Sequence, residues 1–255
     1  MLLAVDIGNS NISLGVFQGE ELRATWRIAT DVNKQADEYE ALFQGMLSIR
    51  SLQPSCIKES VICSVVPPLT GVFQEFCERY LGHKPLIVGM GVKTGIRINY
   101  ESPRDVGADR VADAVAAYHK YGGPVIVVDF GTATVIDAIS GDGVYLGGAI
   151  APGIGIAAEA LFARTSKLHR VELIAPPTAI GKNTADSMQS GLIFGYVGLV
   201  EELVRRFQKE LGEKARVIAT GGLASIIAKE TSVLETVDPN LTLDGLRLIH
   251  QMNVS

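Results

Sequence analysis

Short apolar runs alternate with polar, glycine-rich breaks along this chain, and one arrangement of them occurs twice. The first copy starts with the apolar run LLAVDIG, followed by the alternating segment NISLGVFQGEELRATWRIAT with a QGEE turn inside it. The second copy starts with PVIVVDFG, followed by TATVIDAIS and GVYLGGAIAPG. Aliphatic and β-branched runs broken by turn residues favour strands, so each copy predicts a three-stranded antiparallel meander.

Apolar residues at helical spacing separate and follow these strands. The predicted helices are ADEYEALFQGMLSIRSL, LTGVFQEFCERYLG, ADRVADAVAAYHKYGG, GIAAEALFART, TADSMQSGLIFGYVGLVEELVRRFQKELG, LASIIAKE and TLDGLRLIHQM. In the first helix, one predicted apolar face contains Tyr39, Leu42, Phe43, Met46 and Leu47. Three further buried strands are predicted at SVICSVV, PLIVG and ARVIATGG.

The order of a meander followed by alternating helices and strands is thus repeated. Divergent duplication of one mixed-sheet α/β domain explains it most simply. We expect domains at residues 1–115 and 116–255, packed as a tight pair with an interdomain cleft, because no Pro/Gly/Ser-rich linker separates them.

Composition narrows the classes of function. The chain has 255 residues, is 47% hydrophobic and carries a formal net charge of -5 without any Lys/Arg block, which argues against nucleic acid as a partner. Three cysteines without metal-ligand spacing suit a reducing compartment. The first apolar run is short and stops at Asp6, so neither a secretory signal nor a membrane partner is predicted, and we expect a soluble cytoplasmic protein.

An Asp-x-Gly turn follows the first strand of each copy. Such a turn has a structural interpretation, in which Asp caps its own backbone and Gly supplies a positive φ. It also has a functional one, because Gly8 would let a phosphate approach the N–H groups of residues 8–10, and Asp6 could hold Mg²⁺ directly or through water. The second copy offers Asp129, Gly131, Thr132 and Thr134 in matching places. Two such turns could grip one polyphosphate, and the duplication favours the functional interpretation.

Six motifs, DIGNSN, GADR, DFGTAT, GGAIAPG, GKNTADS and TGG, occur in this order along the chain. In order and spacing the chain resembles the type III pantothenate kinases of the acetate and sugar kinase/Hsp70/actin superfamily. That resemblance implies two actin-like (ribonuclease H-like) domains, each with a mixed five-stranded sheet flanked by helices. It implies phosphorylation of pantothenate to 4'-phosphopantothenate by ATP, the first step of coenzyme A biosynthesis, in a homodimer that requires Mg²⁺ and a monovalent cation, K⁺ or NH₄⁺.

The resemblance also implies roles for individual residues. ATP would be bound by Asp6, Ile7, Gly8, Asn9, Ser10, Asn11, Ile12, Ser13 and Thr132, with Thr220 to Gly222 bordering the nucleoside. Pantothenate would be held by Tyr100, Gly107, Ala108, Asp109, Arg110 and Thr184, the partner subunit helping to close its pocket. Asp109 would be the general base, and Asp129 would help to bind the monovalent cation.

The residues alone leave several of these roles open. Asp109 opens an alanine-rich helix, where a carboxylate often satisfies backbone N–H groups, while Asp113 lies one turn further along the same face and Asp105 is a weaker rival. Thr184, at the start of the long helix, is expected to be its N-cap.

Alternatives to a pantothenate kinase also stay open at this point. Another kinase or a polyphosphate-type phosphatase of the superfamily would share the Asp turns, but we would not expect it to carry GADR. An inactive relative acting as a transcriptional accessory factor should have lost a carboxylate among Asp6, Asp109 and Asp129, and none is missing. In the long helix, Gly191, Gly195 and Gly198 share a face that suits either a dimer seam or internal packing.

Overall fold

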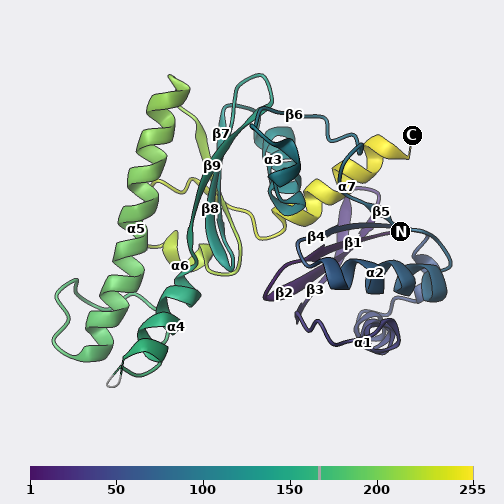
Figure 1. Cartoon of the computed structure of the whole chain (residues 1–255), viewed down its shortest axis with the longest axis horizontal. Helices are drawn as coiled ribbons and strands as arrows, with labels where there is room; N and C mark the ends of the chain where they lie inside the picture. The colour runs from purple at the N-terminus through teal and green to yellow at the C-terminus, as the bar shows by residue number, and fades with distance from the viewer. Residues whose placement is uncertain (166–167, 255) are drawn as a thin grey trace. The chain divides into compact units, whose positions relative to one another are not determined.

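A computed structural model describes residues 1–165 and 168–254 of the chain (Figure 1). Backbone contacts divide it into two compact units. The first unit contains Met1–Gly95, Ser102–Ala116 and the chain from Leu241 onward, and the second contains Ile96–Glu101 and Ala117–Asn240. The predicted division into residues 1–115 and 116–255 stays a prediction about how the domains arose.

The first unit is built on a five-stranded sheet in the order β3-β2-β1-β4-β5. Its strands are β1 (Leu2–Ile7), β2 (Asn11–Gln18), β3 (Glu21–Ala29), β4 (Glu59–Ser64) and β5 (Leu86–Ile87). The first three form the predicted antiparallel meander, and β4 and β5 add in parallel to β1. Its helices are α1 (Ala36–Ile49), α2 (Pro67–Phe76), which continues into a π-helical turn at Cys77–Leu81, and α7 (Leu241–Asn253).

Opposite faces of this first sheet have different neighbours. Leu3, Val5 and Ile7 belong to a core cluster with the aromatic residues of α1 and α2, whereas α7 contacts β1, β2 and β4. Because side chains alternate along a strand, Asp6 points away from that cluster. The end of β1 therefore presents Asp6 on the other face of the sheet.

The second unit contains a six-stranded sheet in the order β11-β10-β7-β8-β9-β6. Its strands are β7 (Val125–Phe130), β8 (Ala133–Ile139), β9 (Val144–Pro152), β10 (Arg216–Thr220), β11 (Thr236–Val237) and β6 (Arg97–Ile98). Its helices are α4 (Ile154–Arg164), α5 (Thr184–Leu211) and α6 (Ala224–Ile227), and α3 (Ala108–Tyr121) runs through both units. Five strands repeat the order and directions of the first sheet.

The prediction of five strands in each sheet is wrong for the second, where β6 adds a sixth by pairing in parallel with β9. The two-residue strands β6 and β11 and the 3₁₀ helices at Pro54–Cys56 and Pro103–Asp105 were not predicted. On α1, Tyr39, Phe43 and Leu47 are buried as expected, but Leu42 is 40% exposed.

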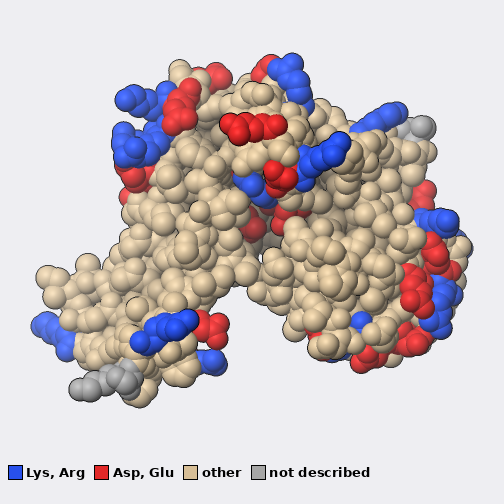
Figure 2. Space-filling view, in the orientation of Figure 1, with Lys and Arg blue, Asp and Glu red and all other residues tan. Residues whose placement is uncertain are grey.

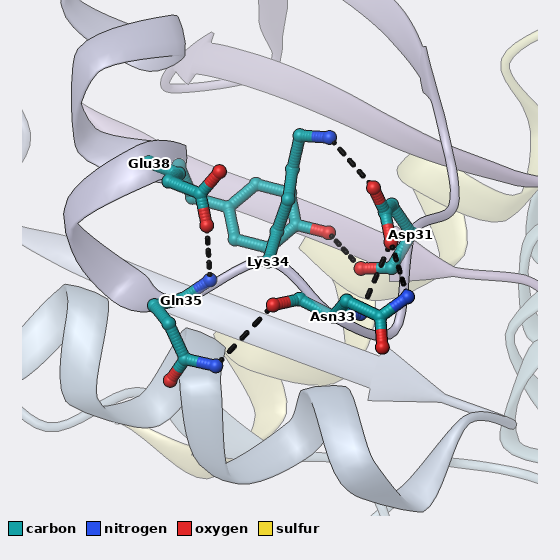
Figure 3. A network of polar contacts seen from close by, with 6 residues as sticks. Asp31, Asn33, Lys34, Gln35 and Glu38 are labelled. Carbon is teal, nitrogen blue, oxygen red and sulfur yellow. Dashed lines mark hydrogen bonds and ion pairs between the residues drawn. The ribbon is translucent and has the colours of Figure 1, made fainter.

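A network of polar contacts fixes the chain between β3 and α1 (Figure 3). Asp31 accepts hydrogen bonds from the Asn33 backbone N–H at 3.0 Å and from Lys34 Nζ at 2.9 Å. The Lys34 side chain is the main reason that the pKa of Asp31 lies below its ordinary value. The Gln35 backbone N–H donates to the Glu38 carboxylate at 2.9 Å, in a capping box that starts α1.

Charged side chains of both signs are mixed at the surface. Figure 2 shows groups in which Lys or Arg lies beside Asp or Glu. Ion pairs at the surface include Arg79 with Glu75 and Arg205 with Glu202. Within the described residues, no helix is both long enough and apolar enough to cross a bilayer.

Candidate active site

The first Asp-x-Gly turn joins β1 to β2 and is held at both ends of its backbone. Gly8 N–H donates to Asn11 O at 3.0 Å, and a Cβ on Gly8 would lie 3.1 Å from that same oxygen. From the end of β3, the Thr30 hydroxyl donates to Gly8 O at 2.6 Å and the Thr30 N–H donates to Ser10 O at 3.1 Å. A side chain at position 8 would force Asn11 O to move by a few tenths of an ångström, so the turn favours glycine.

The residues of this turn differ in what they can offer a ligand. The side chains of Asn9 and Ser10 are exposed. Ile7 and Ile12 pair across the two strands and are fully buried in the core, so they can contribute only main-chain groups. Asn11 and Ser13 are half-buried. A row of amide and hydroxyl donors beside main-chain N–H groups is suited to an anion.

Asp6 lies under this turn in a confined place. Cys63, its register partner on β4, donates a hydrogen bond from Sγ to Asp6 Oδ1 at 3.2 Å. Burial raises the pKa of Asp6 from 3.8 to about 6; the Cys63 hydrogen bond opposes this rise, and the charge of Asp109 adds to it. Burial also raises the pKa of the Cys63 thiol, so the thiol stays protonated and remains a donor. The site thus places two carboxylates of the first unit close enough to repel each other.

The GADR motif forms the start of α3. Asp109 and Arg110 are half-buried, and the Arg110 backbone N–H donates to Asp109 Oδ1 at 2.8 Å. Asp113, the rival on the same helix face, is only 4% exposed and accepts the Thr242 hydroxyl at 2.6 Å. Asp105 is exposed in the 3₁₀ helix that precedes α3. Of these three, Asp109 is the carboxylate whose charge acts on Asp6.

The second Asp-x-Gly turn repeats the first within the second unit. Asp129 is the second-last residue of β7 and pairs in register with Thr220 on β10, just as Asp6 pairs with Cys63 on β4. Gly131 N–H donates to Ala133 O at 3.0 Å, which closes a turn one residue shorter than the one that Gly8 closes with Asn11. Gly221 has φ of +90°, and a Cβ there would clash with the Asp129 carboxylate. A side chain at Gly221 would therefore fill the space beside Asp129.

Thr132 and Gly153 lie beside this second turn and contact each other through their backbones. Thr132 is exposed, and its carbonyl accepts the Gly153 N–H at 3.1 Å. Gly153 belongs to the GGAIAPG motif, and a Cβ on it would clash with the backbone of Thr132. This close approach explains why the motif has glycine after its proline.

Tyr100 and Thr184, expected near pantothenate, also belong to the second unit. Tyr100 follows β6 and is 38% exposed. Thr184 is exposed and is the first residue of α5, but it is not the N-cap that we expected. Asn183 is the cap, because its side chain accepts the Asp186 N–H at 2.9 Å. The Thr184 hydroxyl therefore does not cap α5.

Thr184 lies on a groove between α4 and α5 whose walls are largely apolar. It is lined by Ala157, Ala160, Leu161, Arg164, Thr165, Leu168, Gly181, Lys182, Asn183, Thr184, Ser187, Met188, Gly191, Leu192 and Tyr196. Gly191, Gly195 and Gly198 form an exposed stripe on α5, and a Cβ on any of them would meet no atom within 4 Å. Internal packing therefore does not explain these glycines.

The structure groups the predicted site residues within each unit. The first unit brings together residues 6–13 and 107–110, and the second contains Tyr100, Asp129, Thr132 and Thr184. Sequence analysis missed the supporting residues Thr30 and Cys63. Their signal is the strand register, since Thr30 is the next residue after the β3 partner of Asn11, and Cys63 is opposite Asp6.

Asp6 and Asp129 are the carboxylates at the two turns that could help to hold a cation. In residues 1–165 and 168–254, no three His, Cys, Asp or Glu side chains gather as a complete site. Mg²⁺ usually keeps several waters and takes one or two carboxylates together with substrate phosphates, which Asp6 beside an anion-binding turn fits. A Cβ at Gly221 or Gly131 would crowd the Asp129 carboxylate, so glycine at both positions keeps side chains away from it.

Comparison with known proteins gives a consistent result over the whole chain. The family model described as "Type III pantothenate kinase" matches residues 2–206. A type III pantothenate kinase of Moorella thermoacetica is 55% identical over 253 residues, which cover 99% of this chain and 100% of the relative. A type III pantothenate kinase of Roseiflexus sp. strain RS-1 is 54% identical over 255 residues, covering both chains completely.

Solved structures with lower identity share the fold. A Campylobacter jejuni protein of the Baf family of transcriptional activators has a TM-score of 0.63 at 21% identity and covers 98% of both chains. A Sinorhizobium meliloti protein named as a 2-dehydro-3-deoxygalactonokinase has a TM-score of 0.58 at 15% identity and covers 100% of this chain and 97% of its own. These likenesses confirm the predicted α/β fold class.

Proposed function

Because the chain belongs to the type III pantothenate kinase family, we propose that it transfers the γ-phosphoryl group of ATP to the primary hydroxyl of pantothenate. The products are 4'-phosphopantothenate and ADP, and the reaction is the first step of coenzyme A biosynthesis. In the step itself, the hydroxyl oxygen forms a bond to the γ-phosphorus, the bond to the bridging oxygen of ADP breaks, and the hydroxyl proton passes to a base.

One observation carries this proposal most directly. Asp109, at the start of α3, lies close enough to Asp6 for its charge to help raise the pKa of Asp6 beneath the first turn. Phosphoryl transfer to an alcohol needs a phosphate cradle and a nearby carboxylate that accepts the hydroxyl proton. The first turn supplies the cradle and Asp109 the base. Asp113 is unsuited to that task because it is buried against Thr242.

The remaining residues bind and orient the two substrates. For the ATP phosphates we propose Asp6, Ile7, Gly8, Asn9, Ser10, Asn11, Ile12, Ser13 and Thr132, with Ile7 and Ile12 contributing main-chain groups only. For pantothenate we propose Tyr100, Gly107, Ala108, Asp109, Arg110 and Thr184. The planar guanidinium of Arg110 suits the pantothenate carboxylate.

Two cations would supply charge neutralisation. Mg²⁺, held through Asp6 or its waters, would offset the negative charge of the phosphates. A monovalent cation, K⁺ or NH₄⁺, would be held with the help of Asp129, where glycine at positions 131 and 221 keeps side chains away from the carboxylate. Both assignments rest on oxygen ligands, which hard cations prefer.

We also propose a homodimer whose seam includes the groove between α4 and α5. Large apolar side chains are exposed on this part of the chain, including Ile156 at 47%, Leu161 at 37% and Phe162 at 38%. The exposed glycines of α5 would let a second helix approach closely. Since Thr184 lies on the same groove, a second copy seated there would help to enclose pantothenate.

Duplication of one ancestral domain, with descendants at residues 1–115 and 116–255, accounts for the two turns. The two sheets have the same strand order, and each meander contains one register shift between its second and third strands. Asp6 and Asp129 also pair with residues on equivalent strands, Cys63 on β4 and Thr220 on β10. Independent origins would not be expected to repeat all three features.

The experiment is an ADP-release assay with ATP, Mg²⁺ and pantothenate, with and without K⁺ or NH₄⁺. Phosphorus NMR identifies the product. We expect pantothenate-dependent ADP release, a phosphomonoester product and stimulation by the monovalent cation. A wild-type protein that is folded by circular dichroism but releases no ADP under any cation would overturn the proposed activity.

A further inference from the structure

The sixth strand of the second sheet anchors the segment that carries Tyr100. In β6, Arg97 and Ile98 pair in parallel with Val144 and Tyr145 of β9. One residue further on, the Asn99 N–H donates to Tyr145 O at 2.9 Å. The backbone beside Tyr100 is therefore tied to Tyr145, and the ring of Tyr100 begins from a fixed point.

The ring of Tyr100 then lies against two residues of β9. Its centroid is 6.3 Å from that of the fully buried Tyr145 ring. The ring of Tyr100 also lies over Gly147, because a Cβ added to Gly147 would lie 3.2 Å and 3.3 Å from the ring carbons Cε2 and Cδ2. Tyr100 nevertheless stays 38% exposed. One part of the ring is held by the sheet, and another remains accessible to a ligand.

Tyr145 is itself fixed by a buried polar contact. Its hydroxyl donates to Asp137 Oδ1 at 2.9 Å, and Asp137 is only 3% exposed. A buried carboxylate has to be hydrogen-bonded to offset the cost of its desolvation, so this contact fixes the orientation of both side chains.

The first meander provides an internal control for this arrangement. Aligning the two register shifts matches Leu22 with Tyr145, Ala24 with Gly147 and Gly15 with Asp137. The first copy thus has an apolar residue and a glycine where the second has the buried Tyr–Asp pair. Gly147 has φ of +107°, a conformation that favours glycine, whereas Ala24 at the matching position does not have a positive φ. Two of these differences, at Tyr145 and Gly147, lie against the Tyr100 ring, and the third, at Asp137, holds Tyr145.

We infer that Tyr145, Asp137 and Gly147 form a platform on β9 and β8 that holds the ring of Tyr100 in place for pantothenate, with Tyr145 as a positioning residue. The inference rests on the proposed function, in which Tyr100 contacts pantothenate. Tyr145 is fully buried and acts only through Tyr100. A fixed ring binds a substrate with less loss of side-chain freedom than a mobile one.

The test uses the full-length protein and compares steady-state constants for both substrates. Tyr145→Phe removes the hydroxyl and keeps the ring, and Gly147→Ala installs the residue of the first copy. Gly19→Ala is a control for alanine at a positive φ, of +63°, where a Cβ meets no atom within 4 Å, and thermal melting of Gly147→Ala reports the additional backbone strain at its φ of +107°. Tyr100→Ala and the double variant Tyr100→Ala/Tyr145→Phe complete a cycle.

We expect Tyr145→Phe and Gly147→Ala each to raise the KM for pantothenate about 3-fold to 10-fold, the range of one lost hydrogen bond. The KM for ATP should stay within about 2-fold, and Gly19→Ala should change neither constant beyond this range. In the Tyr100→Ala background, Tyr145→Phe should add nothing further. Circular dichroism melting of each variant separates loss of fold from loss of positioning.

Two failures can be told apart. The platform is wrong, and the proposed function stands, if Tyr100→Ala raises the KM for pantothenate but Tyr145→Phe and Gly147→Ala do not. The same conclusion holds if the effect of Tyr145→Phe persists in full without the Tyr100 ring. If Tyr100→Ala leaves the KM for pantothenate unchanged in an active enzyme, the assignment of Tyr100 to pantothenate fails, and the platform fails with it.

Discussion

Cys63 lies directly opposite Asp6 in the parallel pair of β4 and β1 and donates a 3.2 Å hydrogen bond from Sγ to Asp6 Oδ1. A thiol is a weak donor, so Asp6 is held in place without being strongly stabilised as an anion. Burial raises the pKa of Asp6 to about 6, and the Cys63 hydrogen bond opposes this rise only in part. Four predictions follow from this contact and from the surrounding residues.

Asp6→Asn should stabilise the fold while it removes activity. The pKa of Asp6 is about 6 in the folded protein and 3.8 as its ordinary value, so between these pH values the folded state binds more protons than the unfolded state. Stability therefore falls as pH rises through this window and stays lower above it. We expect the variant to gain about 1 to 3 kcal/mol at pH 8, measured by urea unfolding.

The same measurement at pH 4 is the control for that variant. There Asp6 is protonated in the folded wild type, so the difference in unfolding free energy should become small. A variant that is less stable than wild type at pH 8 would show that the Asp6 carboxylate is mainly a structural cap of its turn.

The pH at which activity falls on the acid side of the pH–activity curve, its acid limb, should depend on Cys63. If Asp6 must be ionised to bind Mg²⁺ with ATP, kcat/KM for ATP falls as pH drops through about 6. The Cys63 hydrogen bond lowers the pKa of Asp6, so Cys63→Ala should move the limb to higher pH by about 0.5 to 1 unit. Cys63→Ser keeps a donor and should move it less.

Titration of ATP itself is the same for wild type and both variants, so it cancels in that comparison. Equal limbs in wild type, Cys63→Ala and Cys63→Ser would mean that a group other than Asp6 sets the acid limb.

Asp109 and Asp113 should separate cleanly into a catalytic and a structural carboxylate. Asp109→Asn is expected to lower kcat by about 100-fold or more, because it removes the proton acceptor. Asp113→Asn should lower the melting temperature, since Asp113 is buried and accepts the Thr242 hydroxyl, but should keep kcat within about 3-fold. Both are measured by the ADP-release assay below the melting temperature. The reverse pattern would make Asp113 the base.

Thr30 should matter for ATP and not for pantothenate. Its hydroxyl holds Gly8 O at 2.6 Å, so Thr30→Val loosens the first turn and should raise the KM for ATP about 3-fold to 10-fold. Thr30→Ser keeps the hydroxyl and serves as the control. An equal rise in the KM for pantothenate would indicate general loss of structure.

Much of the fold could be predicted because its signals are local. The apolar runs that end in Asp and Gly define β1 and β7, and the glycine turns define both meanders. The strands β6 and β11 have two residues each and exist only by pairing with β9 and β10, so no local pattern reports them. Residues far apart in sequence decide such pairings.

The site was predictable in its turns but not in its choice of carboxylate. Asp109 and Asp113 lie one turn apart on α3 and look alike in the sequence. They are distinguished by a contact 129 residues away, where Thr242 of α7 occupies Asp113. Likewise, Asn183 and Thr184 are both good N-cap residues, and only the bond from the Asp186 N–H to Asn183 identifies the cap.

The most direct test of the account is a crystal structure with Mg²⁺ and a non-hydrolysable ATP analogue. The account predicts the analogue's phosphates on the main-chain N–H groups of residues 8–10, Mg²⁺ beside Asp6 and Thr132 in contact with a phosphate. The account would be contradicted if the phosphates were bound away from the first Asp-x-Gly turn and Asp6 still accepted the Cys63 hydrogen bond without Mg²⁺ beside it.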